Sequence, residues 1–157
     1  MKKINITTKI QLCDYNELEP EEKKLIDCAK EACSRAYAPY SQFHVGAAVL
    51  LANGEIITGS NQENVAFPSG LCAERTALFY ANSQYPEQAV KSLAVAAYTQ
   101  GDFIASPISP CGACRQVILE TEMRSKSPVR IFLYGKTEVI IIEGIGQLLP
   151  LAFNTIE

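Results

Sequence analysis

The sequence predicts a three-layer α/β/α sandwich built around a five-stranded mixed sheet. Three observations support this fold class. The expected strands include apolar runs too continuous to have one face in water, helical patterns alternate with the strands, and a two-residue turn joins the first two strands as an antiparallel pair. A sheet of this kind must be covered by helices.

The first helix is expected from residue 20 to about residue 38. Pro20 followed by two glutamates is typical of a helix start, and Leu25 and Ile26 begin an apolar pattern at helical spacing. We expect Pro39 to stop this helix.

The central elements follow one another closely, and the Asn53-Gly54 turn is typical of a two-residue hairpin. In order, the expected elements are a strand at 45–52, a strand at 55–59, a helix at 71–82, a strand at 93–98, a helix at 112–123, and strands at 129–134 and 139–142.

Residues 1–19 are expected to form an N-terminal extension, either part of the same domain or flexible, ahead of one domain at 20–157. Apolar residues alternate within it, which predicts an edge strand. These residues are Ile4, Ile6, Ile10 and Leu12.

Composition and charge restrict the binding partners and the cellular compartment that we expect for this protein. The 157-residue chain has a net charge of −3 and no cluster of Lys or Arg, which argues against a nucleic-acid partner. The N-terminus has basic residues but no apolar region of the length that a signal peptide needs, and no apolar run approaches the length of a membrane span. We therefore expect a cytoplasmic protein with no membrane partner. In a reducing compartment, the six cysteines are better interpreted as thiols or metal ligands than as disulfides.

Three of these cysteines are candidate zinc ligands. Cys111 and Cys114 are three residues apart at an expected helix start, so they share one face. A lone C-x-x-C is also used by thiol–disulfide enzymes, but Cys72 at another helix start supplies a third thiol. Three protein ligands leave one position for water, as in a catalytic zinc site.

The neighbours of these cysteines have chemistry that suits such a site. Zinc with three thiolates carries a net charge of −1, and Arg75 or Arg115 can withdraw charge by donating hydrogen bonds to sulfur. Glu74, two residues after Cys72, is placed to move protons between water and a substrate.

At these residues the chain resembles a known family, the small homotetrameric zinc cytidine deaminases of pyrimidine salvage. The resemblance covers about residues 20–153. Its motifs are Cys72-Ala73-Glu74-Arg75, Pro110-Cys111-Gly112-Ala113-Cys114-Arg115, the run from Ala38 to Ala48, the run from Gly59 to Asn64, and Leu148-Leu149-Pro150 with Phe153.

The resemblance implies hydrolytic deamination of cytidine and deoxycytidine to uridine and deoxyuridine. It implies one zinc ion per chain on Cys72, Cys111 and Cys114, with zinc-bound hydroxide attacking C4 of the base. Glu74 is implied as the proton shuttle and Arg75 as a hydrogen-bond donor to the ligand thiolates.

The resemblance also implies the substrate contacts. Asn61 and Glu63 would bind the ribose 3′-hydroxyl, Phe43 would pack against the pyrimidine, and Ala73 belongs to the same substrate-binding set. Each site would be completed by neighbouring subunits of a homotetramer, with Phe153 reaching across.

The chain departs from the family pattern in a few places. Gln62 stands where valine is usual, and Phe67 stands where a tyrosine is often found, so a hydroxyl is missing there. His44 has no matching family role and is interpreted as structural or surface-exposed.

Three other functions are compatible with parts of this pattern. A blasticidin-type deaminase would leave the ribose-binding pair Asn61 and Glu63 without a use. A deaminase of DNA or RNA typically has His-x-Glu where this chain has Cys72-Ala73-Glu74. A structural zinc protein would need a fourth protein ligand, and neither Cys13 nor His44 is well placed to supply it.

Overall fold

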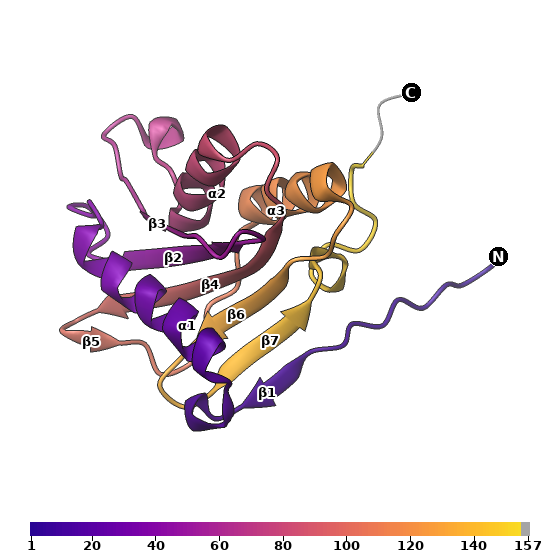
Figure 1. The fold of residues 1–157 in the computed structure, drawn as a ribbon, viewed down its shortest axis with the longest axis horizontal. Helices are drawn as coiled ribbons and strands as arrows, with labels where there is room; N and C mark the ends of the chain where they lie inside the picture. Colours follow the sequence, from indigo (N-terminus) through magenta and orange to yellow (C-terminus); the bar gives the residue numbers. More distant parts are fainter. Residues whose placement is uncertain (155–157) are drawn as a thin grey trace.

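The computed structural model describes residues 1–154, which form one mixed sheet with helices on both faces (Figure 1). The strands among these residues are β1 (Gln11–Cys13), β2 (His44–Leu51), β3 (Ile56–Ser60), β4 (Val90–Thr99), β5 (Asp102–Phe103), β6 (Arg130–Tyr134) and β7 (Val139–Glu143). The helices are α1 (Pro20–Ala32), α2 (Ala73–Gln84) and α3 (Gly112–Ser125).

The strands lie in the order β1-β7-β6-β4-β2-β3, with β5 attached to β4. Neighbouring strands are antiparallel except β4 and β6, which pair in parallel. A parallel pair requires a crossover connection, and α3 lies within the one that joins these two strands.

The prediction of an α/β fold with a mixed sheet is confirmed, but the predicted count of five strands is wrong, because the described sheet has seven. The five predicted strands correspond to β2, β3, β4, β6 and β7. Of the other two, β1 lies at the end of the expected edge strand and pairs with β7. The two-residue β5 is too short to have a periodic signal.

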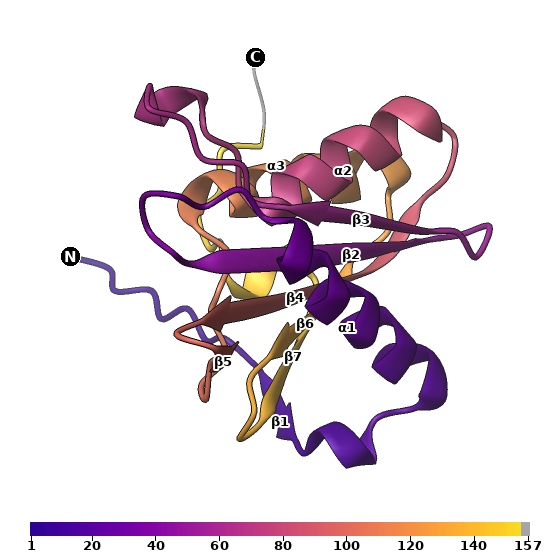
Figure 2. The same cartoon turned by 90° about the vertical axis from the view of Figure 1, so that its left-hand side faces the viewer.

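The two faces of the sheet are covered by different helices (Figure 2). On β2, Ala47 and Val49 pack in the cluster that contains α2 and α3, whereas Ala48 and Leu50 pack in the cluster that contains α1. This alternation follows from the two-residue repeat of a strand. It explains why the strands are apolar on both faces and gives the predicted three layers.

The first helix ends earlier than predicted, because α1 stops at Ala32 and a short 3₁₀ turn, Cys33–Arg35, follows it. The chain then becomes extended at Ala36, and the backbone of Tyr37 bonds to the segment after β3. Tertiary hydrogen bonds therefore end the helix before Pro39.

Two glycines allow the helices to approach the sheet closely. A Cβ atom at Gly46 would lie 2.0 Å from the Ala29 carbonyl oxygen of α1, and one at Gly59 would lie 2.5 Å from the Ala77 amide nitrogen of α2. Any side chain at these positions would therefore push a helix off the sheet. Since Cys72 caps α2, the contact at Gly59 also sets the position of that thiol.

We predict that Gly59→Ala lowers the free energy of unfolding by about 1–3 kcal/mol, because the added methyl group overpacks the α2 interface. Gly146→Ala is the control, since a Cβ there meets no atom within 4 Å, and its effect should stay within about 0.5 kcal/mol. Urea denaturation measures both. Equal stability of the two variants would contradict the importance of this helix contact.

Candidate functional site

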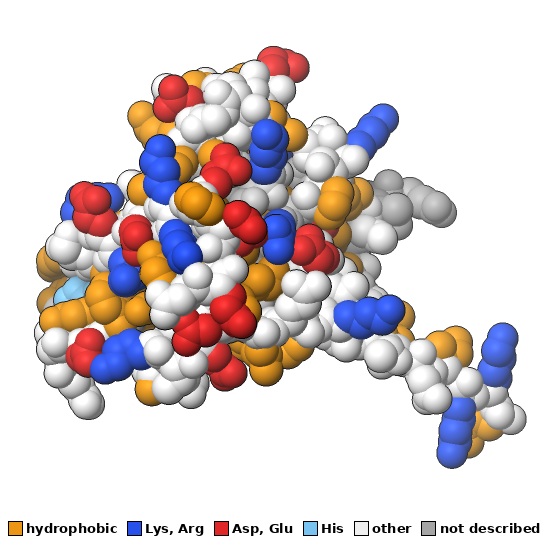
Figure 3. All heavy atoms as spheres, turned by 60° about the horizontal axis from the view of Figure 1, so that its bottom comes forward, with side chains coloured by type: hydrophobic (Ala, Val, Ile, Leu, Met, Phe, Trp, Pro, Cys, Tyr) orange, Lys and Arg blue, Asp and Glu red, His pale blue; other side chains and the backbone are white. Residues whose placement is uncertain are grey.

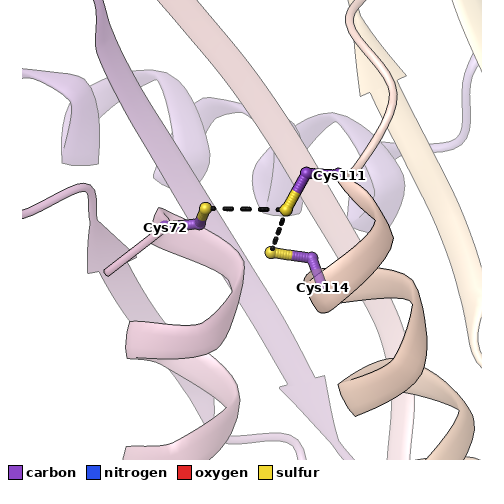
Figure 4. Close-up of side chains that lie close together, drawn as sticks. All are labelled: Cys72, Cys111 and Cys114. Carbon is purple, nitrogen blue, oxygen red and sulfur yellow. Dashed lines mark hydrogen bonds between the residues drawn. The ribbon is translucent and has the colours of Figure 1, made fainter. Parts of the chain in front are cut away.

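Three thiols converge at the adjacent N-termini of α2 and α3 (Figure 4). Cys72 is the N-cap of α2, Cys111 is the N-cap of α3, and Cys114 lies in the first turn of α3. The Cys72 and Cys111 sulfurs are 3.8 Å apart, and the Cys111 and Cys114 sulfurs are 3.5 Å apart. Among residues 1–154 this is the only such group of possible metal ligands.

This geometry fits a zinc ion. Zn–S bonds of about 2.3 Å in a tetrahedron place sulfurs about 3.8 Å apart, and the two distances above are close to that value. All three sulfurs lie within 4.8 Å of one another. The convergence of Cys72 with the C-x-x-C pair therefore favours a metal site over a thiol–disulfide motif, which needs only two thiols.

The electrostatic surroundings stabilise negative charge on sulfur. Arg75 donates a hydrogen bond from Nη2 to the Cys72 sulfur at 3.6 Å, and both helix N-termini favour thiolates. A hydrogen bond with Cys114, followed by the bond from Arg75, lowers the pKa of Cys72 to about 5. The same contact with Cys72, together with burial, raises the pKa of Cys114. Within this pair, negative charge is therefore favoured on Cys72 rather than on Cys114.

A buried carboxyl group lies in the same helix turn. Glu74, the second residue of α2, is only 5% exposed. Burial raises the pKa of Glu74, and the nearby negative charge of Cys72 adds to this effect. A buried carboxyl group with a raised pKa beside a metal site is suited to accept and return a proton.

A cavity of about 380 Å³ opens beside the thiols. Cys72 and Arg75 lie on its wall, together with Asn61 and Glu63 from the segment after β3. Glu63 accepts hydrogen bonds from the backbone N–H groups of Tyr40 and Ser41, at 2.9 and 3.3 Å. A hydrogen bond from the Ser41 side chain is the main cause that lowers the pKa of Glu63, so its carboxylate remains ionised.

The chain was compared with protein families and solved structures. Residues 19–127 match the cytidine and deoxycytidylate deaminase zinc-binding region. The chain belongs to this family. A cytidine deaminase of Sporosarcina psychrophila is 46% identical over 132 residues, which cover 84% of this chain and 90% of the relative.

Solved structures agree with this assignment. The crystal structure of cytidine deaminase from Burkholderia pseudomallei has a TM-score of 0.71 and 41% identity, and the match covers 83% of this chain and 97% of that one. The structure of the enzyme from Mycobacterium tuberculosis has a TM-score of 0.68 and 33% identity, over 87% of this chain and 100% of that one. No helix within residues 1–154 is both long and apolar enough to cross a membrane.

The deaminase domain brings some of the expected substrate residues together within one chain and leaves others apart. Asn61 and Glu63 line the cavity beside Cys72, and Ala73 is fully buried at the start of α2. Phe43 is half-buried and lies outside the residues that line this cavity, whereas Phe153 is 70% exposed in the C-terminal segment.

The structure adds a scaffolding function for Asn61 that the sequence did not indicate. Its side-chain oxygen accepts a hydrogen bond from the Val45 amide at 2.7 Å, and its amide nitrogen donates one to the Phe43 carbonyl at 2.9 Å. Asn61 therefore continues the pairing of β2 and β3 through its side chain and orients the backbone at Phe43. One N–H of the amide is left for another partner.

The two arginines that follow the cysteine motifs have different partners. Arg75 contacts the Cys72 sulfur as expected. Arg115 instead donates hydrogen bonds to the carbonyl oxygens of Pro110 and Leu148, at 2.8 and 2.7 Å. It fixes the segment that contains Leu148 to the loop in front of α3, so its position after the motif serves the fold around the site.

Two aromatic residues at the edge of the cavity form a pair for which the sequence indicated no function. The rings of Tyr40 and Phe67 meet edge to face, with centroids 6.0 Å apart, and both residues are exposed. The run Ala38-Pro39-Tyr40-Ser41 was a motif of the resemblance, so the signal for Tyr40 was present in the sequence.

We predict that Arg75→Gln raises the pKa of Cys72 in the metal-free protein by about one pH unit, because a neighbouring cation favours the thiolate. Alkylation of Cys72, followed across pH by mass spectrometry, should have its midpoint near 5 in the parent chain and higher in the variant. The exposed Arg124 provides the control as Arg124→Gln. An unchanged midpoint in Arg75→Gln would show that this arginine does not set the charge on Cys72.

Proposed function

We propose that this protein catalyses the hydrolytic deamination of cytidine and deoxycytidine to uridine and deoxyuridine, with release of ammonia, as in pyrimidine salvage. The observation that supports it best is the convergence of three thiols beside a cavity that Cys72 lines, with buried Glu74 two residues after Cys72 in α2. The family of the chain and the names of its relatives support the same reaction.

In this proposal, Cys72, Cys111 and Cys114 hold one zinc ion per chain. When bound, zinc supplies the Lewis-acid chemistry that activates water near neutral pH. Arg75 neutralises part of the negative charge of three thiolates through its bond to the Cys72 sulfur. The hydrogen bond lowers the electron density that the sulfur would donate to a bound zinc ion. The ion would therefore keep the Lewis acidity that is needed to activate water.

Glu74 transfers the protons. Its buried carboxyl group, with a raised pKa, takes a proton from water and delivers it to N3 of the pyrimidine, so that C4 becomes open to attack. Once the water oxygen is bonded to C4, Glu74 takes its remaining proton and delivers it to the amine. The C4–N bond then breaks, ammonia leaves, and the oxygen becomes the C4 carbonyl of the product. Burial excludes bulk water, which would otherwise exchange these protons.

Glu63 and Asn61 select the substrate. The ionised carboxylate of Glu63 accepts a hydrogen bond from a 3′-hydroxyl but repels a 3′-phosphate, which favours a free nucleoside over a residue within a DNA or RNA strand. Asn61 has one free N–H for the same hydroxyl. The resemblance to the family, rather than the lining of the cavity, supports the packing of Phe43 against the base and the place of Ala73 in the substrate-binding set. The free thiols of the described chain suit a cytoplasmic setting.

We further propose a homotetramer with sites at subunit interfaces. The support is that Phe153 lies exposed and outside the cavity of its own chain. An exposed aromatic residue of this kind can complete the cavity of a neighbour. The backbone carbonyl of Phe153 accepts a hydrogen bond from Gln116 at 2.8 Å, which ties this residue to α3 of its own chain.

We predict that Glu74→Gln loses about 10²–10⁴-fold in kcat for cytidine, as is typical of general acid–base catalysis, while it keeps its zinc. Ultraviolet absorbance follows the conversion of cytidine, and the metal content is measured on the same samples. Parent protein that contains zinc but does not convert cytidine would refute the proposed reaction. Near-parental turnover by the variant would refute the proposed role of Glu74 but not the proposed reaction.

Two cysteine variants control the metal measurement. Cys114→Ser removes a proposed ligand and should lose both zinc and activity, whereas Cys28→Ser changes a half-buried thiol of α1 on the other face of the sheet and should keep both.

We predict that Phe153→Ala raises KM for cytidine up to about tenfold, since an aromatic contact contributes about 0.5–1.5 kcal/mol. If Phe153 serves a neighbouring site, mixing this variant with Glu74→Gln after subunit exchange should restore sites with a parental KM. Each such site takes Glu74 from one variant and Phe153 from the other. Failure of the mixture to recover, or an active monomer in sedimentation, would contradict shared sites.

A further inference from the structure

The N-terminal arm, residues 1–10, runs away from the body as an extended segment that leads into the edge strand β1 (Figure 1). It lies before the matched deaminase region, which begins at residue 19. Figure 3 shows hydrophobic and Lys side chains along this projecting arm. The proposed catalytic site uses none of these residues.

The arm and β1 have one apolar side. Even-numbered positions carry Ile4, Ile6, Ile10 and Leu12, whereas the odd positions between them carry polar residues. These four side chains are 77%, 55%, 49% and 58% exposed. A two-residue repeat of this kind is the pattern of a strand with one buried face, yet nothing within residues 1–154 covers that face.

The arm also presents an unpaired edge. Thr8 Oγ1 donates a hydrogen bond to the Gln147 carbonyl at 2.9 Å, and the Lys9 amide donates one to Gln147 Oε1 at 2.8 Å. The backbone groups of Lys9 therefore face their own chain. Since backbone groups alternate in direction along a strand, those of the even-numbered residues face outward. Strand β1 is the last strand of the sheet on this side.

The charges of the arm and of the residues after β1 indicate which kind of strand pairs with this edge. The arm contains Lys2, Lys3 and Lys9 and no Asp or Glu, in a chain whose net charge is −3. Directly after β1, Asp14 and Glu17 are exposed acidic residues. A basic arm that ends beside acidic groups is complementary to itself when two copies run in opposite directions.

We propose that residues 4–12 of two copies of this chain pair as antiparallel strands across a two-fold axis at Thr8. In this register, Ile6 lies opposite Ile10 and Ile4 lies opposite Leu12 of the second copy, and Lys2 lies opposite Asp14. Ile4, Ile6, Ile10 and Leu12 are even-numbered positions with outward backbone groups. The backbone N–H and carbonyl of Asp14 are bonded to Glu17, so Asp14 meets Lys2 through its side chain. The apolar side chains of both copies then cover one another on a single face.

Alternative registers fit less well. A shift of two residues in one direction places Lys2 opposite Leu12, and a shift in the other direction places Asp14 opposite Ile4. A shift of one residue moves every apolar side chain to the wrong face. The pairing joins the two sheets into one continuous sheet, and it does not depend on the proposed catalytic function.

Disulfide trapping of the full-length zinc-loaded protein tests the register. Residues paired directly across an antiparallel ladder have Cα atoms about 5.5 Å apart, within reach of a disulfide. Thr8→Cys should therefore form an oxidised dimer at least tenfold more than Asn5→Cys. In the proposed register, the two copies of residue 5 lie about 20 Å apart.

A second pair of variants tests the apolar face. Adding Ile6→Lys to Thr8→Cys places a charge against Ile10 of the second copy and should abolish the cross-link, whereas adding Asn5→Lys on the opposite face should leave it. Equal trapping at residues 5 and 8, or trapping that Ile6→Lys does not reduce, would overturn the proposal. It would also be overturned if Thr8→Cys gave no dimer while the parent chain bound phosphatidylserine vesicles and Ile6→Lys did not.

Discussion

The site depends on two helices that begin side by side. The thiols of Cys72 and Cys111 meet at the N-termini of α2 and α3, and near the other ends Asn82 donates a hydrogen bond to Thr121 at 3.3 Å. The helices are therefore parallel, so their dipoles are aligned and their positive ends adjoin. Such an arrangement is unfavourable unless negative charge lies at the shared end. Thiolates supply this charge, and the helices in turn lower the cost of ionising them.

The sheet makes this helix pair possible. The contact of Gly59 with α2 sets one helix against the β2–β3 hairpin, and α3 lies within the crossover between the parallel strands β4 and β6. The other face, covered by α1, carries none of the cysteines of the cluster. A conventional three-layer fold thus confines the reactive groups to one end of one layer.

Much of this could be predicted from the sequence, because the signals were local. The spacing of Cys111 and Cys114, the position of Glu74 after Cys72, and the apolar runs of the five long strands each lie within a short window. The features that were missed depend on contacts between distant segments. The backbone of Tyr37 ends α1 by pairing beyond β3, Asn61 binds the backbone of Phe43 and Val45, and Arg115 holds Leu148. Periodicity and spacing carry no information about such partners.

The meeting of two helix N-termini at one metal site has a further consequence. Cys72 and Cys111 are 39 residues apart in sequence, so a metal ion between them closes a long loop that includes β4 and β5. Closing a loop of this length constrains the unfolded chain in the same way as a covalent cross-link. The ion that activates water would therefore also hold two distant segments of the chain together. Metal binding and the docking of α3 beside α2 would then be thermodynamically coupled, so that each stabilises the other.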